Sequence, residues 1–467
     1  MTQPSSLSDL RGATDADGDF VDPRFVALEI ARFLREGDTD SIRAFFETQE
    51  LADVAAYLEE LGTEDALTAM RLLRLHDQAE LIAHLRPASQ VTIATLMRRR
   101  ELAALMSAMS HDERADLYKQ LDEEAQEALL PALSKAERED LRRLAAYEEW
   151  TVGSVMTSDY ATLKPEMTSS QALEALRAQA LEAETVYTAY IVDEAHRLIG
   201  VLELEDLLIA RPRQRVGDIM DTDPVSIGAD AAQEEAARLI ARYDLIALPV
   251  LDGNGRLVGI VTADDAMDVA EQEATEDIHK GSTVGPMESS VGEASIFTLY
   301  RARIFWLVLL VFGNIFSGAG IAYFQQTIAA HLSLLFFLPL LIASGGNAGA
   351  QSATLMVRAL ATGDVRPADF GRLLAREVLI ALGLGLTMAI AVSAIGLWRG
   401  GPEIALVVAS AMVAIVLMGA LFGMSLPFIF DRFNRDPAAA SGPLVTSMAD
   451  ILGVMTYFTI AAALLDI

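Results

Sequence analysis

The sequence predicts a multidomain membrane protein: an α-helical N-terminal superhelix, a tandem pair of α+β modules, a long connecting helix and a transmembrane domain of five helices. Three observations lead to this prediction. Leu and Ala recur at helical spacing through residues 25–148, an internal repeat occupies residues 149–263, and five apolar stretches follow residue 300.

The net charge of −30 belongs to the part of the chain that precedes the apolar stretches. Residues 300–467 hold nine Arg and no Lys against eight Asp and Glu, so residues 1–299 carry the whole acidic excess. This balance argues against a nucleic-acid partner, which needs a basic face. It fits either a surface that concentrates cations or an ordinary solubilising surface. The absence of Cys excludes disulfides and thiolate metal sites, and it fits a reducing cytoplasm.

The first part of the chain is predicted to be helical after a short tail. Residues 1–24 are polar and acidic without an apolar run, so we expect a disordered tail and no signal peptide. Residues 25–148 read as short helices, with breaks at Gly37, Gly62, Pro87, Ser110 and Pro131. Such an array of helical hairpins is typical of interaction or regulatory scaffolds.

An internal repeat follows. TVGSVMTSDYATLKPEMTSSQALEALR, from Thr151, is echoed by RVGDIMDTDPVSIGADAAQEEAARLI, from Arg215, which gives one copy over 149–212 and one over 213–263. Each copy predicts a turn, a helix and two strands joined by a Gly-containing hairpin. The pair resembles tandem CBS modules. This resemblance implies binding of an adenine nucleotide such as ATP through Thr262 and Asp265, although the first copy has Glu203 where the Thr would be. Alternatively, Asp265 only caps the helix that follows.

Residues 264–299 are predicted to form the connecting helix, which runs from Ala263 to about Phe297. Its segment DDAMDVAEQEATEDIHK holds seven carboxylates in seventeen residues. Because like charges on one helix repel, this helix needs bound cations or a basic neighbour.

The transmembrane domain, residues 300–467, is predicted from apolar stretches at 304–323, 332–357, 378–398, 404–430 and 443–465. Each can cross a hydrocarbon core of ~30 Å, so a lipid bilayer is an expected partner. Arg399 lies alone on one side, and the other Arg residues of this domain all fall on the opposite side. The positive-inside rule therefore places the N-terminal half in the cytoplasm and the C-terminus outside.

Asp450 stands near the middle of the last apolar stretch, where a carboxylate costs at least ~2.5–3.5 kcal/mol. It could pair with a cation, relay protons or bind an ion. No Lys or Arg lies near the centre of any stretch, and few other titratable groups are present, so an ion site is the best explanation. One carboxylate is few for a divalent ion, but a symmetric dimer would supply two to a hydrated Mg2+.

Two further segments supply candidate pore-lining residues. In the second stretch, glycines accompany the polar residues Asn347, Gln351 and Thr354. In the last, Gly442 and Pro443 interrupt the helix before Asp450, and Thr446 offers a hydroxyl to ion-bound water. The alternative for the second stretch is a seam of small residues at which helices pack.

Over nearly its whole length the chain resembles the MgtE family of magnesium channels. The most specific segments are RYDLIALPVLDGNGRLVGIVTADDAMDVAEQEATEDIH, GGNAGAQSATLMVRALATGD and DPAAASGPLVTSMADILG. The resemblance implies a homodimer in a bacterial plasma (inner) membrane that conducts Mg2+ into the cytoplasm past Asp450 and closes when acidic domains bind Mg2+. The matching sensor positions are Asp112, Asp116, Glu234, Asp244, Asp265, Asp268, Glu276 and Asp277.

The chain departs from the family at Ala350 and Gly442, where relatives often have Asn, and this leaves the preference among divalent cations open. Two other function classes compete: a cation-coupled transporter that also accepts Co2+ or Mn2+, and a CBS-regulated membrane sensor that transports nothing. Five stretches do not divide into the equal halves typical of many secondary transporters. An enzyme is not expected, because the sequence lacks a P-loop, an HExxH motif and any Cys nucleophile.

Overall fold

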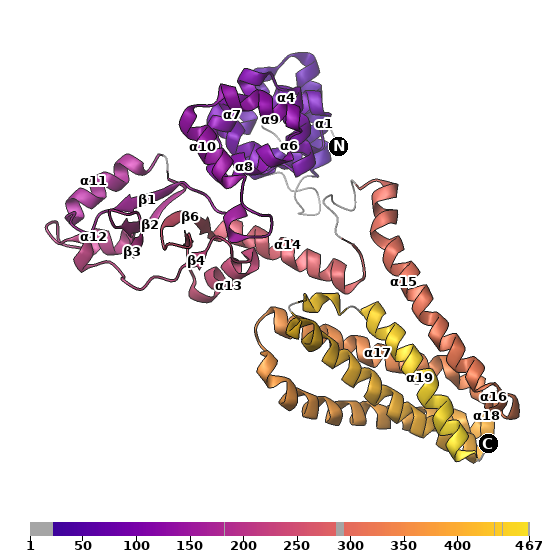
Figure 1. The fold of residues 1–467 in the computed structure, drawn as a ribbon. Coiled ribbons are helices and arrows are strands. Elements are labelled where there is room, and N and C mark those ends of the chain that lie inside the picture. The colour runs from indigo at the N-terminus through magenta and orange to yellow at the C-terminus, as the bar shows by residue number, and fades with distance from the viewer. Residues whose placement is uncertain (1–21, 182, 286–293, 434, 441, 466–467) are drawn as a thin grey trace. The chain divides into compact units, whose positions relative to one another are not determined.

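The computed structural model describes residues 22–181, 183–285, 294–433, 435–440 and 442–465 (Figure 1). The chain divides between Glu271 and Gln272 into two compact units. The acidic tail predicted at 1–24 lies almost wholly outside the described residues. The predicted fold class is confirmed in its parts: a helical array, a repeated α+β module, an acidic helix and long apolar helices.

The N-terminal helices stack as a superhelix. They are α1 Pro23–Glu36, α2 Thr39–Phe46, α3 Leu51–Glu59, α4 Thr63–Met70, α5 Leu75–Ala83, α6 Pro87–Leu96, α7 Arg99–Ala108, α8 His111–Gln120, α9 Glu123–Leu129 and α10 Lys135–Leu144. From α3 onward, α5 packs on α3 and α7 on α5, while α6 packs on α4 and α8 on α6. Ile30, Ile42, Val54 and Leu81 are fully buried between them. The Leu and Ala periodicity therefore becomes the core of this array.

The repeat folds as two similar modules. The first contains β1 Tyr160–Leu163, α11 Ser169–Gln179, β2 Thr185–Val192, β3 Leu198–Glu203 and α12 Leu204–Ile209. The second contains β4 Ile227–Gly228, α13 Gln233–Tyr243, β5 Ala247–Leu251 and β6 Leu257–Thr262. In each sheet the first strand pairs parallel to the second, and the third pairs antiparallel to the second. The short strands β1 and β4 were not predicted, because so few residues show no clear alternation.

The two modules exchange backbone pairing. Thr157, before β1, forms a bridge with Ile260 of β6, with N–H to O=C distances of 2.9 Å in both directions. Asp221, before β4, pairs with Val201 of β3 in the same reciprocal way, again at 2.9 Å. Each module therefore adds one bridge to the edge of the other's sheet, and the segment that holds Thr157 is fixed by the second copy.

The connecting helix is shorter than predicted. Helix α14 spans Ala263–Gly281 and does not continue to Phe297. After Gly281 the chain turns with Thr283 at φ 56°, and the N–H of Val284 bonds to the carbonyl of His279 at 2.8 Å, which closes the helix end. The run Gly-Ser-Thr-Val-Gly-Pro contains weak helix formers, which explains the early end. Residues 286–293 lie outside the described part.

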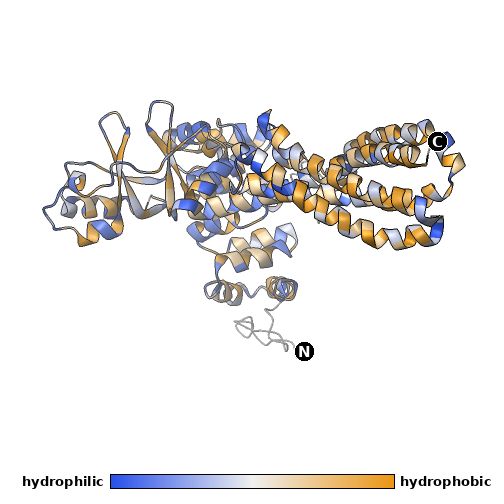
Figure 2. Cartoon of the chain, turned by 90° about the horizontal axis from the view of Figure 1, so that it is seen from below, coloured by the Kyte–Doolittle hydropathy of each residue, from blue (hydrophilic) through white to orange (hydrophobic). Residues whose placement is uncertain are grey.

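The five predicted membrane stretches fall on four described helices that are long and apolar enough to cross a membrane. They are α15 Ile296–Tyr323, α17 Ser333–Ala361, α18 Phe370–Arg432 and α19 Gly442–Leu464, with the short α16 Gln325–Ala330 and the turn η6 Pro437–Ala439 between them. Helix α18 holds the third and fourth stretches and is broken at Gly401, whose φ of 82° only Gly adopts easily. Figure 2 shows these helices as the predominantly hydrophobic part of the chain.

Glycines let the membrane helices approach closely. A side chain at Gly349 would meet the carbonyl oxygen of Gly419 at 2.7 Å, and Gly345 and Gly423 also lie on this α17–α18 contact. Helix α19 packs against α15, α17 and α18. The Tyr457 hydroxyl donates to the carbonyl of Leu334 at 3.0 Å, which fixes α19 to α17.

Candidate functional site

An acidic cluster lies where α8 meets the start of α14, inside the first compact unit. Asp112 and Glu113 belong to the first turn of α8, and Asp265 to the first turn of α14. Burial, reinforced by Asp112, Asp116, Asp265 and Asp268, raises the pKa of Glu113 to about 8. Burial and the charge of Asp112 likewise raise the pKa of Asp265 to about 8. Each ionised carboxylate of the cluster thus makes ionisation of the neighbouring carboxyl groups less favourable.

Asp112 stands at the centre of this cluster. Burial raises the pKa of its carboxyl group, and its Oδ1 is buried with no hydrogen-bond partner within the described residues. The hydroxyl of Thr157, held by the second module, lies beside it. A buried oxygen without a donor is costly unless a cation or water meets it.

The sequence-predicted sensor residues separate into two groups. Asp112, Asp116, Asp265 and Asp268 gather around the junction of α8 and α14. Glu234 instead pairs with Arg238 of its own helix, and Asp244 caps α13 in the left-handed region at φ 53°. Neither is among the charges that act most strongly on the cluster.

Two members of the cluster were missed by sequence reasoning. Glu113 lies beside Asp112, and Glu184 comes from the chain just before β2. Partial burial of its carboxyl group, together with Asp112, Asp159 and Asp264, raises the pKa of Glu184 to about 7, but the residue as a whole is exposed, so it lies at the rim of the cluster. The three acidic residues in HDERAD, residues 111–116, could have indicated Glu113 as a member of the cluster. No local sequence pattern indicates Glu184.

The cluster does not form a complete metal shell by itself. Within the described ranges, no group of three or more His, Asp or Glu side chains is placed to hold a metal ion. Mg2+ dehydrates reluctantly and keeps several waters, so it needs only one or two carboxylates at such a site. The orphaned oxygen of Asp112 and the raised pKa values fit a hydrated cation of this kind.

A separate ionic network joins α8 to the first module. His111 Nδ1 lies 2.8 Å from Asp159 Oδ1 and 3.0 Å from Asp140 Oδ2. Burial favours neutral imidazole, but these two carboxylates prevail and raise the pKa of His111 to about 9. The charged imidazolium therefore holds α8, α10 and the segment before β1 together without a metal ion.

The candidate nucleotide motif lies at the end of β6. Thr262 Oγ1 donates to Asp265 Oδ2 at 2.5 Å, across the first turn of α14. The two side chains are thus already paired with each other. Asp265 belongs to both this motif and the acidic cluster.

The second half of α14 carries its own contacts within the second unit. Lys280 Nζ lies 2.9 Å from Glu276 Oε1 and 2.6 Å from Asp436 Oδ2. Glu276 therefore has an ammonium partner, which the sequence prediction did not foresee. Asp277 lies on the same turn.

Asp450 lies on α19 and is partly exposed. Its carboxylate makes no hydrogen bond or ion pair with the described part of the chain. Thr446, one turn earlier, sits against Gly346 of α17, where a side chain would meet its Cγ2 at 2.9 Å. A Cβ added at Gly442 would lie 3.8 Å from the Ala350 Cβ, so the two departures from the family pattern are neighbours.

Helix α17 carries both features predicted for its sequence, a packing seam of small residues and a set of polar residues that could line a pore. Gly345, Gly346 and Gly349 are buried and serve the packing seam. Asn347, Gln351 and Thr354 are exposed in the single chain and share a different face, since they stand four and three residues apart. Both the seam and a polar face are therefore present on one helix.

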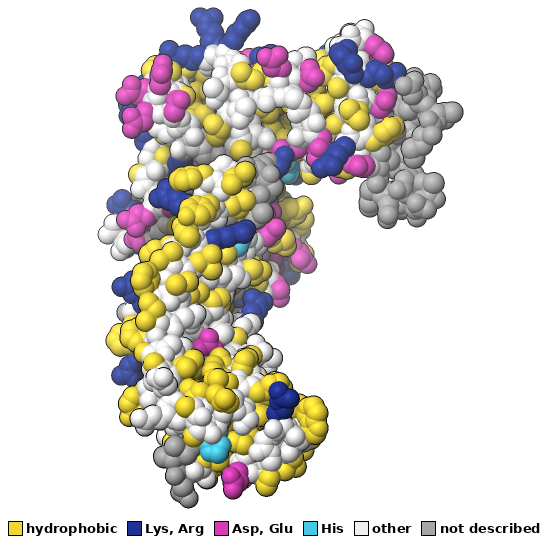
Figure 3. All heavy atoms as spheres, turned by 90° about the vertical axis from the view of Figure 1, so that its right-hand side faces the viewer, with side chains coloured by type: hydrophobic (Ala, Val, Ile, Leu, Met, Phe, Trp, Pro, Cys, Tyr) yellow, Lys and Arg dark blue, Asp and Glu magenta, His cyan; other side chains and the backbone are white. Residues whose placement is uncertain are grey.

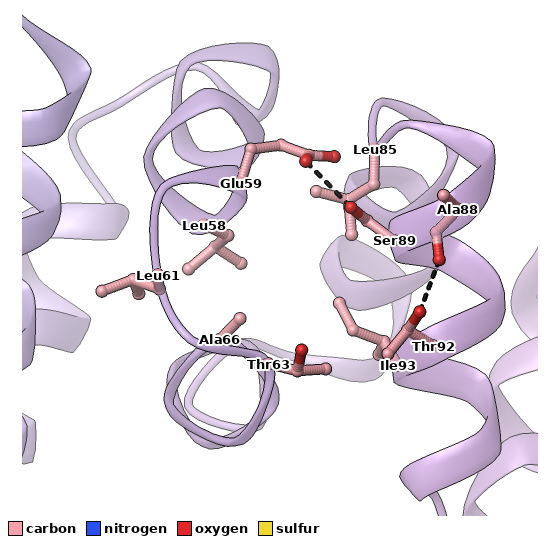
Figure 4. A pocket seen from close by; sticks show the side chains of 10 residues that line it. All are labelled: Leu58, Glu59, Leu61, Thr63, Ala66, Leu85, Ala88, Ser89, Thr92 and Ile93. Carbon is pink, nitrogen blue, oxygen red and sulfur yellow. Dashed lines mark hydrogen bonds between the residues drawn. The ribbon is translucent and has the colours of Figure 1, made fainter. Parts of the chain in front are cut away.

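A small cavity of about 140 Å³ lies in the N-terminal array between α3, α4 and α6 (Figure 4). Its polar wall is Glu59, which accepts from Ser89 Oγ at 2.8 Å and from the backbone N–H of Arg86 at 2.7 Å. The remaining walls are mostly apolar, as Leu58, Leu85 and Ile93 show. This carboxylate is already paired, so the cavity gives no indication of a ligand.

The helical array, the paired modules and the apolar helices around Asp450 define a multi-pass membrane transporter with a large N-terminal part that precedes the apolar helices. Family models agree: "Divalent cation transporter" matches residues 338–460, "MgtE intracellular N domain" matches 49–150, and "CBS domain" matches 152–213 and 216–271.

The chain belongs to the MgtE family of magnesium transporters. The magnesium transporter MgtE of Thermus thermophilus is 43% identical over 323 residues, which cover 69% of this chain and 72% of that protein. The Bacillus subtilis magnesium transporter MgtE is 35% identical over 321 residues, 68% of this chain and 71% of that one. The homologues indicate transport rather than catalysis.

Solved structures resemble the first unit. The cytosolic domain of the Mg2+ channel MgtE in complex with ATP is similar with a TM-score of 0.50 and 39% identity, over 52% of this chain and 99% of that one. The soluble part of a magnesium transporter gives a TM-score of 0.51 at 27% identity, over 54% and 100%.

Proposed function

We propose that the protein is a channel that conducts Mg2+ into the cytoplasm, with Asp450 as its pore carboxylate. The observation that carries this proposal is the carboxylate itself. Asp450 is the one acidic residue inside the five apolar stretches, and the described chain offers it no internal partner. A charge in that position is too costly to keep as a mere anchor.

A homodimer would complete this site. One carboxylate per chain provides few ligands for a divalent ion. A two-fold axis beside α19 would bring two Asp450 side chains to one hydrated Mg2+. Helix α15 leaves an apolar surface for lipid or for a second copy, because only 6% of its most apolar 18-residue segment is buried in the single chain. Hydrophobic side chains are spread over the face drawn in Figure 3. Such a helix needs lipid or a second copy to cover it.

The acidic cluster is proposed as the sensor that closes the channel. Without a cation, ionised Asp112, Glu113 and Asp265 would repel one another, and burial together with this repulsion raises the pKa of Glu113 and of Asp265. Bound Mg2+ would neutralise this repulsion and hold α8 on α14, and its loss would loosen the junction. Glu234, Asp244, Glu276 and Asp277 remain proposed sensor residues on the family resemblance alone.

ATP is proposed as a ligand of the CBS pair near Thr262 and Asp265. A solved relative of the first unit is described as a complex with ATP. The intact Thr262–Asp265 pair in the second module supports one nucleotide site, and Glu203 argues against a matching one in the first.

We place the protein in a bacterial plasma (inner) membrane, with the N-terminal part in the cytoplasm and the C-terminus outside. The Arg distribution supports this orientation, since Arg399 alone lies on the outer side.

The decisive experiment is Mg2+ uptake into liposomes by the full chain and by Asp450→Asn. We expect the variant to abolish uptake while it stays folded and keeps its oligomeric state by size-exclusion chromatography. Glu403→Gln, which neutralises an exposed carboxylate beside the Gly401 break, is the matched control and should transport normally. Unchanged flux in Asp450→Asn would refute the pore assignment. Uptake that collapses when only the pH gradient is removed would favour a cation-coupled transporter.

A further inference from the structure

Lys280 links two distant parts of the membrane unit. It lies in the last turn of α14, and its Nζ contacts Asp436 Oδ2 at 2.6 Å, across 156 residues of sequence. The same ammonium contacts Glu276 Oε1 at 2.9 Å. Both carboxylates therefore share one cation that belongs to the protein itself.

Asp436 fixes the turn that leads into α19. While its Oδ2 receives the ammonium, its Oδ1 accepts the backbone N–H of Ala438 at 2.8 Å and so caps η6. This turn is well anchored, because Ala438 and Ala440 are each only 2% exposed and η6 packs on α17 and α18. Helix α19 begins directly after it, and Asp450 lies eight residues into that helix.

Lys280 is also the only Lys or Arg of α14. Its position in the last turn suits the negative end of the helix dipole. Just beyond it, the N–H of Gly285 bonds to the carbonyl of Ala302 in α15 at 2.8 Å. The end of α14 is thus tied to two membrane elements, and the ammonium makes the link that reaches the pore helix.

We propose that Lys280 is a positioning residue that couples α14 to the pore helix through Asp436 and thereby sets the Mg2+ concentration at which the channel closes. This inference rests on the proposed function. With the ammonium present, Glu276 and Asp436 attract the same group. Without the ammonium group, Glu276 and Asp436 are two neighbouring carboxylates that repel each other. Only additional Mg2+ can compensate their charge, so closure needs a higher Mg2+ concentration.

The test is Mg2+-dependent closure in Lys280→Met, measured in liposomes with the full chain. We expect the Mg2+ concentration for half closure to rise roughly two- to fivefold, the range for one partly exposed ion pair. Lys280→Arg should keep the native value, because the guanidinium can still contact both carboxylates. Lys135→Met is the matched control, because Lys135 only pairs with Glu139 on an exposed surface.

A double-mutant comparison isolates the coupling. Lys280→Met combined with Asp436→Asn should shift closure no further than the larger single change. Shifts that add, or a native value in Lys280→Met, would overturn the proposal.

Backbone hydrogen exchange of the full chain in detergent separates this inference from the proposed function. In Lys280→Met, amide exchange should quicken both at Ala438 and in the last turn of α14. If the native protein shows no Mg2+-dependent closure, the proposed function fails, and the exchange result still decides whether Lys280 holds the turn. Unchanged exchange at Ala438 would reject that role.

Discussion

Glu113 and Asp265 hold protons that an exposed carboxyl group would have lost. Their pKa values rise from 4.5 and 3.8 to about 8, so the metal-free folded state favours their protonated forms. The contribution of this protonation to the free energy of unfolding is fully present when the pH lies below the pKa values that Glu113 and Asp265 have in the unfolded chain. It is lost as the pH rises through about 8.

From this linkage we predict that Mg2+ binding to the first unit releases protons and tightens as the pH rises from about 6 to about 8. Isothermal titration calorimetry of the full chain in buffers of different ionisation enthalpy measures both effects. Asp112→Asn should reduce both the affinity and the proton release, whereas Asp53→Asn, on the exposed side of α3, should change neither. Affinity that is independent of pH would contradict the cluster as the Mg2+ site.

At the scale of the element, the α17–α18 seam depends on missing side chains. A Cβ at Gly423 would collide with the carbonyl of Gly349, which is backbone and cannot rotate away. Gly383 of the same α18 faces open space. We predict that Gly423→Ala lowers the free energy of unfolding by at least about 1–3 kcal/mol, whereas Gly383→Ala is nearly neutral. Thermal unfolding in detergent, with uptake as a second measure, compares the two, and equal stability of both variants would exclude the seam.

The elements also show what the sequence could predict. Long, strongly periodic segments such as α17 and α19 were predicted to within a few residues. The two-residue strand β4 and the end of α14 at Gly281 depend on local pairing and on the turn at Thr283, which periodicity does not encode. At the site, Asp112 was proposed only because it matches a position of the MgtE family, and Asp265 because it also belongs to the Thr262-x-x-Asp265 motif. Glu184 joins them only through the tertiary fold.

For the whole molecule, the division at Glu271 and Gln272 predicts separable behaviour. Residues 22–271 expressed alone should fold, and Mg2+ should raise their midpoint of thermal unfolding through the cluster. Residues 272–467 alone should transport Mg2+ in liposomes with little closure by Mg2+ on the cytoplasmic side. Full Mg2+-dependent closure by that second fragment would place the sensor outside the acidic cluster.

The exchanged backbone pairing of the two modules has a consequence for synthesis on the ribosome. Val201 can meet Asp221 soon after both emerge, but Thr157 must wait until Ile260 has left the exit tunnel. Thr157 is also the neighbour of Asp112, so the acidic pocket cannot be assembled while the second copy is still being translated. A nascent chain arrested before residue 260 would carry the complete N-terminal array but would lack the acidic cluster that we propose as the Mg2+ sensor.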